Sequence, residues 1–182
     1  MNAGLIVIDM LNPYEHEDAE PLAASAQRAL DDVCALVAAA REEELRIVYV
    51  NDNHGDWSAG PRDIARRALA GARPDLVEPV LPPDDAPFIV KARHSIFYET
   101  LLEYLLHREE ITRLVLAGQV TEQCILYSAL DGYVRHFEVV IPTHAIAHID
   151  EQLAQAALRM MKDNMHVQLA TDTEAVLEAC RA

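Results

Sequence analysis

The chain has 182 residues, and hydrophobic types make up 51% of them, which is enough to build the core of a single domain over residues 1–182. A net charge of -15 repels nucleic acids and anionic membranes, so neither is an expected partner. Apolar runs are too short for a membrane span or a secretory signal, so we expect a cytoplasmic protein.

Short runs rich in Val, Ile and Leu alternate with helical patterns along the chain. The expected strands cover residues 5–8, 47–50, 88–90, 114–117, 139–141 and 167–170. The expected helices cover residues 19–41, 98–106, 122–134 and 150–165, with a helical turn or two near 64–70. Residues 52–87 are otherwise irregular, as in a functional loop or lid. This alternation predicts an α/β fold, a Rossmann-like three-layer α/β/α sandwich around a six-stranded parallel sheet.

Three reactive side chains follow predicted strands. Asp9 comes directly after the first strand, Lys91 directly after the third, and Cys124 shortly after the fourth. Ligands of open parallel sheets bind beyond the carboxyl ends of the strands. A buried carboxylate such as Asp9 also needs a partner, which the ammonium group of Lys91 can supply. We therefore expect an acid, an amine and a thiol to share one edge of the sheet.

Cys124 stands three residues after Thr121, which can cap the helix that follows the fourth strand. Unpaired N–H groups of a first helical turn stabilise a thiolate, and they can also hold an oxyanion. The other two cysteines, Cys34 and Cys180, have apolar neighbours at helical spacing and fit buried hydrophobic positions. With no CxxC spacing, neither a disulfide framework nor a structural zinc site is indicated.

Four blocks of sequence resemble the isochorismatase-like cysteine hydrolases in order and spacing. They are IVIDMLN (6–12), VNDNHG (50–55), KARHSIFYET (91–100) and AGQVTEQC (117–124). The resemblance covers nearly the whole chain and includes nicotinamidases, N-carbamoylsarcosine amidases and isochorismatases.

The resemblance implies a catalytic triad. Asp9 would take the thiol proton of Cys124, Lys91 would orient and stabilise the charges, and a thioester-type intermediate would form. It also implies a cis peptide bond between Val120 and Thr121, which would aim N–H groups near Thr121 and at Cys124 into an oxyanion hole. No cofactor is expected.

Members of the family cleave small amides and carbamoyl compounds, and some hydrolyse the vinyl ether of isochorismate. In nicotinamidases an Asp and two His residues hold a metal. Asp52 and His54 match the first pair, but no second His follows in the expected region, so we expect no metal. Gln119 replaces a small apolar residue and His144 an Asp, and we expect both to alter the substrate pocket.

Aromatic residues gather around the expected site although they form only 5% of the chain. Trp57 in the irregular segment, Phe97 and Tyr127 are the expected pocket residues, and core packing is the alternative for the last two. We expect a small, flat, neutral or singly negative substrate, and a homo-oligomer, a dimer or tetramer, whose second subunit completes the pocket.

The alternatives differ in class. A receiver-type signalling domain also carries acids and a Lys at strand ends, but it would need paired acids after the first strand. An inactive binding protein on the same fold would not need all three triad residues. An isochorismatase-type ether hydrolase does not require a nucleophilic thiol, so Cys124 favours amide chemistry.

Overall fold

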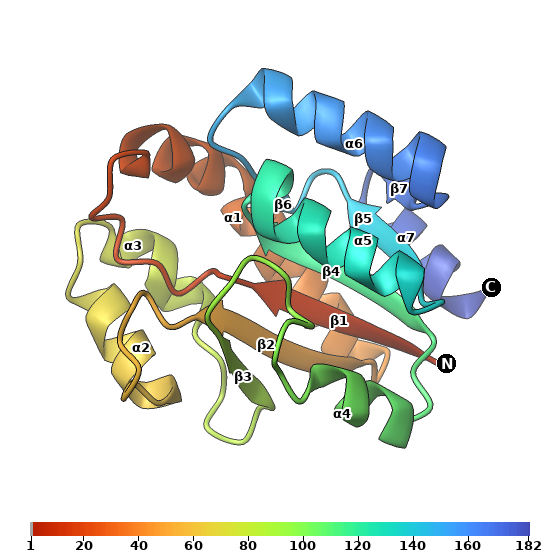
Figure 1. Ribbon diagram of the computed structural model, residues 1–182, viewed down its shortest axis with the longest axis horizontal. Helices are drawn as coiled ribbons and strands as arrows, with labels where there is room; N and C mark the ends of the chain where they lie inside the picture. Colours follow the sequence, from red (N-terminus) through yellow and green to blue (C-terminus); the bar gives the residue numbers. More distant parts are fainter. Residues whose placement is uncertain (1) are drawn as a thin grey trace.

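The computed structural model describes residues 2–182 and shows a parallel β-sheet enclosed between helices (Figure 1). Within that range the seven strands are β1 (Ala3–Ile8), β2 (Arg46–Asp52), β3 (Phe88–Lys91), β4 (Arg113–Gln119), β5 (Glu138–Pro142), β6 (Ile146–Ala147) and β7 (Gln168–Ala170). The order is β3-β2-β1-β4-β5-β7, and β6 pairs with the end of β4. The predicted α/β fold is confirmed, with the two-residue strand β6 in addition.

Helices lie between most successive strands, and a last helix follows β7. They are α1 (Ala19–Glu42), α2 (Pro61–Leu69), α3 (Pro74–Val77), α4 (Leu102–Arg108), α5 (Leu126–Val134), α6 (Glu151–Met165) and α7 (Thr173–Arg181). Helix α4 begins four residues later than predicted, because the Thr100 hydroxyl donates to the Ile96 carbonyl and closes a turn there. Helices α2 and α3 fill much of the segment predicted to be irregular. No helix within residues 2–182 is long and apolar enough to cross a membrane.

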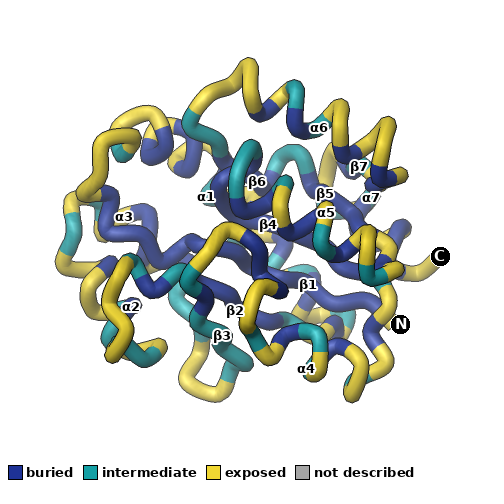
Figure 2. Tube along the Cα trace, in the orientation of Figure 1, coloured by how far each residue is buried: buried dark blue, intermediate teal, exposed yellow. Residues whose placement is uncertain are grey.

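Alternate residues of each strand face opposite layers, which divides the core in two. In β1, Ile6 and Ile8 pack in a cluster with residues of α4, α5 and α6. Leu5 and Val7 pack in a second cluster with residues of α1 and α7. Figure 1 shows α4, α5 and α6 in front of the sheet and α1 and α7 behind it, and Figure 2 shows the strands buried between them. The fold is thus a three-layer sandwich.

The central strands part at their carboxyl ends. The pairing of β1 with β2 and β4 stops at Ile8, opposite Val50 and Gly118. Gly118 has a φ of 114°, and a Cβ there would lie 2.2 Å from the Ile8 carbonyl oxygen, so only glycine fits. Beyond this point β4 turns away from β1 and leaves an opening where the strand order reverses, which is the usual ligand position in such sheets.

Candidate active site

Asp9, Lys91 and Cys124 meet at this opening. Lys91 Nζ lies 2.8 Å from Asp9 Oδ2 and donates to Cys124 Sγ at 3.5 Å. All three residues are buried, with exposed fractions of 6%, 2% and 8% respectively. Strand β1 supplies the acid, β3 supplies the amine, and the turn after β4 supplies the thiol. The structure therefore brings together the three residues that the sequence singled out.

Asp9 is held on several sides. Its φ is 55°, in the left-handed region that non-glycine residues rarely occupy. Its N–H donates to the Val50 carbonyl at 2.9 Å, and its Oδ1 accepts from the Asp52 N–H at 2.7 Å. Its Oδ2 accepts no well-aligned hydrogen bond from any residue in 2–182, although the Lys91 ammonium lies beside it. This carboxylate oxygen keeps a lone pair free to take a proton.

Lys91 stays charged in spite of its burial. Burial lowers its pKa, but the charges of Asp9, Cys124 and Asp52 outweigh that effect and raise the pKa above its ordinary value. Asp52 Oδ2 is the second carboxylate oxygen near the ammonium, at 3.5 Å. An ammonium between two carboxylates and a sulfur atom is well placed to stabilise negative charge on that sulfur.

The surroundings of Cys124 act against the thiolate that a helix start favours. Burial raises the pKa of Cys124, the Asp9 carboxylate raises it further, and Lys91 offsets only part of the rise. Desolvation is the largest of these effects, because it acts against the charged form of a thiol that is 8% exposed. Formation of the thiolate therefore needs a proton acceptor, and Asp9 is the neighbouring base.

The turn that carries Cys124 differs from the prediction in two ways. The cis peptide bond joins Gln119 to Val120, one residue earlier than expected, directly where β4 ends. Thr121 is not a helix cap, because its hydroxyl donates to the Ala147 carbonyl of β6 at 2.9 Å. Residues Thr121–Ile125 form a π-helical turn, in which the Ile125 N–H donates a hydrogen bond to the Val120 carbonyl. The Cys124 N–H thereby loses its ordinary α-helical acceptor.

A cleft of about 550 Å³ lies beside the triad. Its lining residues come from the segment after β2 and the segment after β3: Asp52, Asn53, His54, Gly55, Trp57, Ala92, Arg93, His94 and Tyr98. His94 connects the cleft to the thiol, because its Nδ1 lies 3.7 Å from Cys124 Sγ and its ring stacks on Tyr127 at 5.3 Å. Trp57 is 84% exposed at this cleft.

The predicted pocket residues have different positions. Trp57 lines the cleft, and Tyr127 lies at it through the stack with His94. Phe97 does not line it, since its ring packs in the core against Phe137 at 5.7 Å. Val120 and Thr121 are buried in the turn below the thiol. The core alternative is therefore right for Phe97.

The two departures from the family pattern lie outside the cleft. Gln119 is fully buried, and its amide bonds to the Asp9 carbonyl and the Tyr14 hydroxyl. His144 lies 3.4 Å from the Thr173 hydroxyl, in a smaller hollow on the other side of Thr121. Neither residue lines the cleft, and their expected effect on the substrate pocket stays a prediction.

Asp52 and His54 do not form a metal-binding set. His54 Nε2 lies 3.0 Å from the Leu11 carbonyl and so faces the backbone. Asp52 faces Lys91 and accepts the His54 N–H at 2.8 Å. No group of three His, Cys, Asp or Glu residues within 2–182 is arranged to hold a metal ion. The residues present do not fit the metal centre that some members of the family carry.

Two residues near the triad had no role in the sequence prediction of the catalytic groups. Asp52 joins the triad through Lys91, and His94 reaches the thiol. Both were visible in the sequence, Asp52 as a strand-end acid after β2 and His94 within the block that holds Lys91. Their contacts with the triad depend on the chain directions after β2 and β3, which no sequence pattern encodes.

Known proteins share the whole of this architecture. Residues 3–174 match the isochorismatase domain family. An isochorismatase family protein of Bacillus subtilis, YaaI, is 29% identical over 94% of this chain and 95% of its own length. A probable inactive nicotinamidase of Arabidopsis thaliana is 27% identical over 89% of both chains. The crystal structure of nicotinamidase PncA from Bacillus subtilis is 28% identical, covers 93% of this chain and 99% of its own, and superposes with a TM-score of 0.72. The chain belongs to the isochorismatase family.

Proposed function

We propose that residues 1–182 form a single hydrolase domain that cleaves a small amide or carbamoyl compound, with Cys124 as nucleophile, Asp9 as general base and Lys91 as stabilising cation. The observation that carries the proposal is the buried contact of all three groups at the edge of a cleft. Membership of the isochorismatase family and likeness to a nicotinamidase support C–N bond cleavage.

The first half of the reaction forms a thioester. The free Oδ2 of Asp9 takes the thiol proton as Cys124 Sγ attacks the carbonyl carbon, and the carbonyl π electrons move to oxygen. Lys91 stays protonated and stabilises the charge on sulfur as it develops. When the tetrahedral intermediate collapses, the C–N bond breaks, and the Asp9 carboxylic acid returns its proton to the departing nitrogen, which leaves as ammonia or an amine.

The second half of the reaction restores the thiol. A water molecule attacks the thioester carbon while Asp9 accepts one of its protons. The C–S bond then breaks, and the sulfur takes the proton back from Asp9. The products are the carboxylic acid, or the carbamic acid in the case of a carbamoyl substrate, and the enzyme in its starting state. Asp9 thus carries the proton in both halves, which requires its carboxylate to remain close to the sulfur throughout.

The oxyanion of each tetrahedral intermediate needs hydrogen-bond donors. The Cys124 N–H is available because Val120 O accepts from Ile125 at 3.0 Å and from Gln123 at 3.1 Å instead. We assign a second donor to the N–H of Thr121 in the same turn. Preorganised backbone donors of this kind stabilise the developing charge without needing to move during the reaction.

The cleft favours a small substrate with at most one negative charge. Trp57 and Tyr98 provide flat surfaces, and the only fully cationic side chain among the lining residues is Arg93. One guanidinium can bind one carboxylate, while the net charge of -15 repels a polyanion. The predicted homo-oligomer and cytoplasmic location stay predictions.

A screen of primary amides, ureides and carbamoyl compounds for ammonia release tests the function. We expect release from at least one compound, loss of that release in Cys124→Ala, and unchanged release in the Cys34→Ala and Cys180→Ala controls. Turnover of isochorismate alone would support the ether hydrolase, and binding without turnover in the native protein would support the inactive binding protein. Either of these results would overturn the amidase proposal.

Removal of metal ions by a chelator tests whether turnover depends on a bound metal. Because the residues around Asp52 and His54 do not form a three-ligand set, exhaustive dialysis against a chelator should leave the turnover rate unchanged. The measurement is turnover before and after dialysis, with metal content followed by mass spectrometry. A loss of activity that zinc or manganese restores would contradict this expectation.

A further inference from the structure

Gln119 occupies a position that the catalytic mechanism above does not use. It is the last residue of β4 and is fully buried, 0% exposed. Its side-chain Nε2 donates to the backbone carbonyl oxygen of Asp9 at 2.6 Å, across 110 positions of sequence. A buried amide needs partners for its donor and its acceptor, and one of these partners is the backbone of the general base.

The sheet explains why Asp9 needs this bond. Parallel pairing of β1 with β4 stops at Ile8, because β4 turns away at Gly118. The Asp9 carbonyl is therefore buried just past the last rung of the ladder. A buried carbonyl without a donor is destabilising, because it has lost its hydrogen bonds to water. The Gln119 side chain replaces the missing backbone donor.

The orientation of the amide follows from its second contact. Tyr14 Oη lies 3.1 Å from Gln119 Oε1, and burial raises the pKa of Tyr14 to about 12, so the hydroxyl keeps its proton and donates. Because Oε1 accepts from Tyr14, Nε2 must face the Asp9 carbonyl, and the reversed amide would place two oxygens together. The hydrogen bonds therefore run in one direction: Tyr14 donates to Gln119, and Gln119 donates to Asp9.

We propose that Gln119 is a positioning residue that fixes the backbone of Asp9 and, through it, the carboxylate that takes the proton of Cys124. The inference rests on the proposed function, since it assumes that Asp9 is the base. Asp9 has a φ of 55°, and its N–H and Oδ1 are already bound to Val50 and Asp52. Gln119 binds the remaining backbone group of Asp9 and so fixes the peptide plane that follows it. A small apolar residue at position 119 cannot do this.

Gln119→Met removes the donor and keeps the side-chain length. We expect kcat to fall between about 10- and 100-fold and KM to stay within about twofold, because the base is displaced while the cleft is not touched. Ser25→Ala is the matched control. Ser25 is also buried and accepts the His148 N–H at 3.1 Å, but it lies on α1 away from Asp9. It should lower the melting temperature without changing kcat.

The pH dependence of Cys124 alkylation separates positioning from loss of stability. The groups that face the thiol are Asp9, Lys91 and His94. The Asp9 carboxylate raises the pKa of the thiol, so Asp9→Asn should move the midpoint of iodoacetamide labelling to lower pH. Gln119→Met should move it in the same direction by a smaller amount. Adding Gln119→Met to Asp9→Asn should cause no further shift.

Peptide mass spectrometry reports the labelling of Cys124 separately from that of the other cysteines. If Asp9→Asn moves the midpoint and a folded Gln119→Met leaves both midpoint and kcat at wild-type values, the positioning role is overturned. If Asp9→Asn itself has no effect on either, the proposed function fails instead. Should Gln119→Met not fold, Tyr14→Phe frees the amide to rotate and should give a smaller shift in the same direction. A wild-type midpoint and kcat in Tyr14→Phe would then count against the inference.

Discussion

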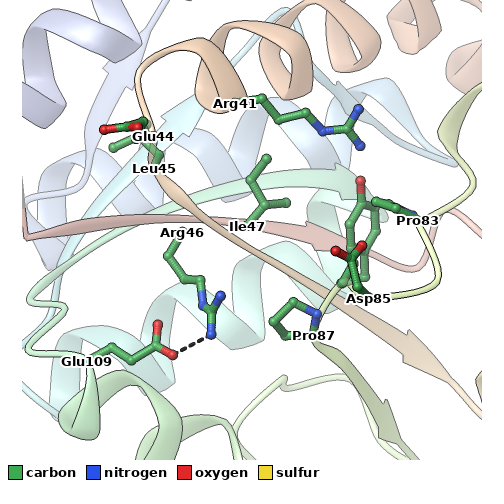
Figure 3. Close-up of a pocket in the computed structure, with 11 residues that line it drawn as sticks. Arg41, Glu44, Leu45, Arg46, Ile47, Pro83, Asp85, Pro87 and Glu109 are labelled. Atoms are coloured by element: carbon green, nitrogen blue, oxygen red, sulfur yellow. Dashed lines mark hydrogen bonds and ion pairs between the residues drawn. The ribbon is translucent and has the colours of Figure 1, made fainter.

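Both ends of the sheet have a pocket with charged side chains, but the charged side chains are exposed at one end and buried at the other. At the amino-terminal ends of β2 and β3, a pocket of about 490 Å³ contains Arg41, Arg46, Tyr49 and Asp85 (Figure 3). Its ion pair, Arg46 with Glu109, has side chains that are 42% and 28% exposed. At the carboxyl ends, the Lys91 side chain is fully buried and that of Asp9 is 9% exposed.

This difference separates a site that can do chemistry from a surface hollow of similar size. Water screens the charges of an exposed ion pair, so the groups keep nearly ordinary properties. Buried groups act on one another strongly, and at the carboxyl ends a thiol, an ammonium group and a carboxylate are buried in contact, so that burial and neighbouring charges raise the pKa of Cys124 well above its ordinary value. Neither hollowness nor charge alone identifies an active site in this molecule.

The largest effect that we expect is on turnover. Asp9→Asn, Lys91→Met and Cys124→Ala should each reduce kcat by about 10⁴-fold or more, and their combinations should lose little beyond that, because the residues act as a unit. Arg46→Ala at the other end of the sheet should leave kcat unchanged. Steady-state kinetics with the best substrate of the screen measures both. Comparable losses at both ends would remove the distinction.

A substitution at the carboxyl ends of the strands should also lower the free energy of unfolding more than one at the amino-terminal ends. Lys91→Met leaves the Asp9 carboxylate buried without its cation, which costs about 3–5 kcal/mol of unfolding free energy. Arg46→Ala breaks an exposed pair and should cost at most about 1 kcal/mol. Combining Lys91→Met with Asp9→Asn should recover most of the loss. Denaturant unfolding tests this, and a double variant no more stable than Lys91→Met would contradict it.

The two neighbours of the thiol should shift its pKa in opposite directions. Asp9→Asn removes a negative charge, so thiolate absorbance should appear at a lower pH, while Lys91→Met removes a positive charge and should move it to a higher pH. Cys34, whose pKa burial and Asp31 raise, is the internal control and should not move. Shifts of the same sign would refute the assigned contacts.

The smallest effect concerns the cleft wall. Trp57→Ala should raise KM about threefold to tenfold with little change in kcat, because an aromatic contact contributes about 0.5–1.5 kcal/mol. Tyr104→Ala is the matched control, since Tyr104 is also exposed, at 68%, but lies on α4 and does not line the cleft. Equal effects of the two substitutions would mean that Trp57 does not contact the substrate.

Much of the fold and the identity of the triad candidates could be predicted from the sequence. Strand-end positions follow from hydrophobic runs, and parallel strands bring their carboxyl ends to one edge, so the sequence predicts that Asp9, Lys91 and Cys124 share that edge. It does not predict that Lys91 reaches Asp9 across β2, which lies between β3 and β1. Short or weakly patterned elements were missed, as with β6, whose pairing depends on Gly118 and Gln119 in β4.

The direction of the pKa shift of Cys124 could not be predicted in the same way. A helix start favours a thiolate, but the sequence does not reveal how deeply Cys124 is buried or how close Asp9 comes to it. The role of Gln119 was hidden for a similar reason, because its partner is a backbone carbonyl 110 positions away. Phe97 was misplaced because an aromatic residue six positions after Lys91 in the sequence can point into the core as easily as into the cleft.

The burial and the raised pKa of Cys124 also have a consequence under oxidative stress. Peroxides attack thiolates far faster than thiols, and exposure controls the rest of the susceptibility. Cys124 is 8% exposed and its raised pKa keeps the proton in place. Burial and a raised pKa therefore both slow the conversion of the Cys124 sulfur to sulfenic acid.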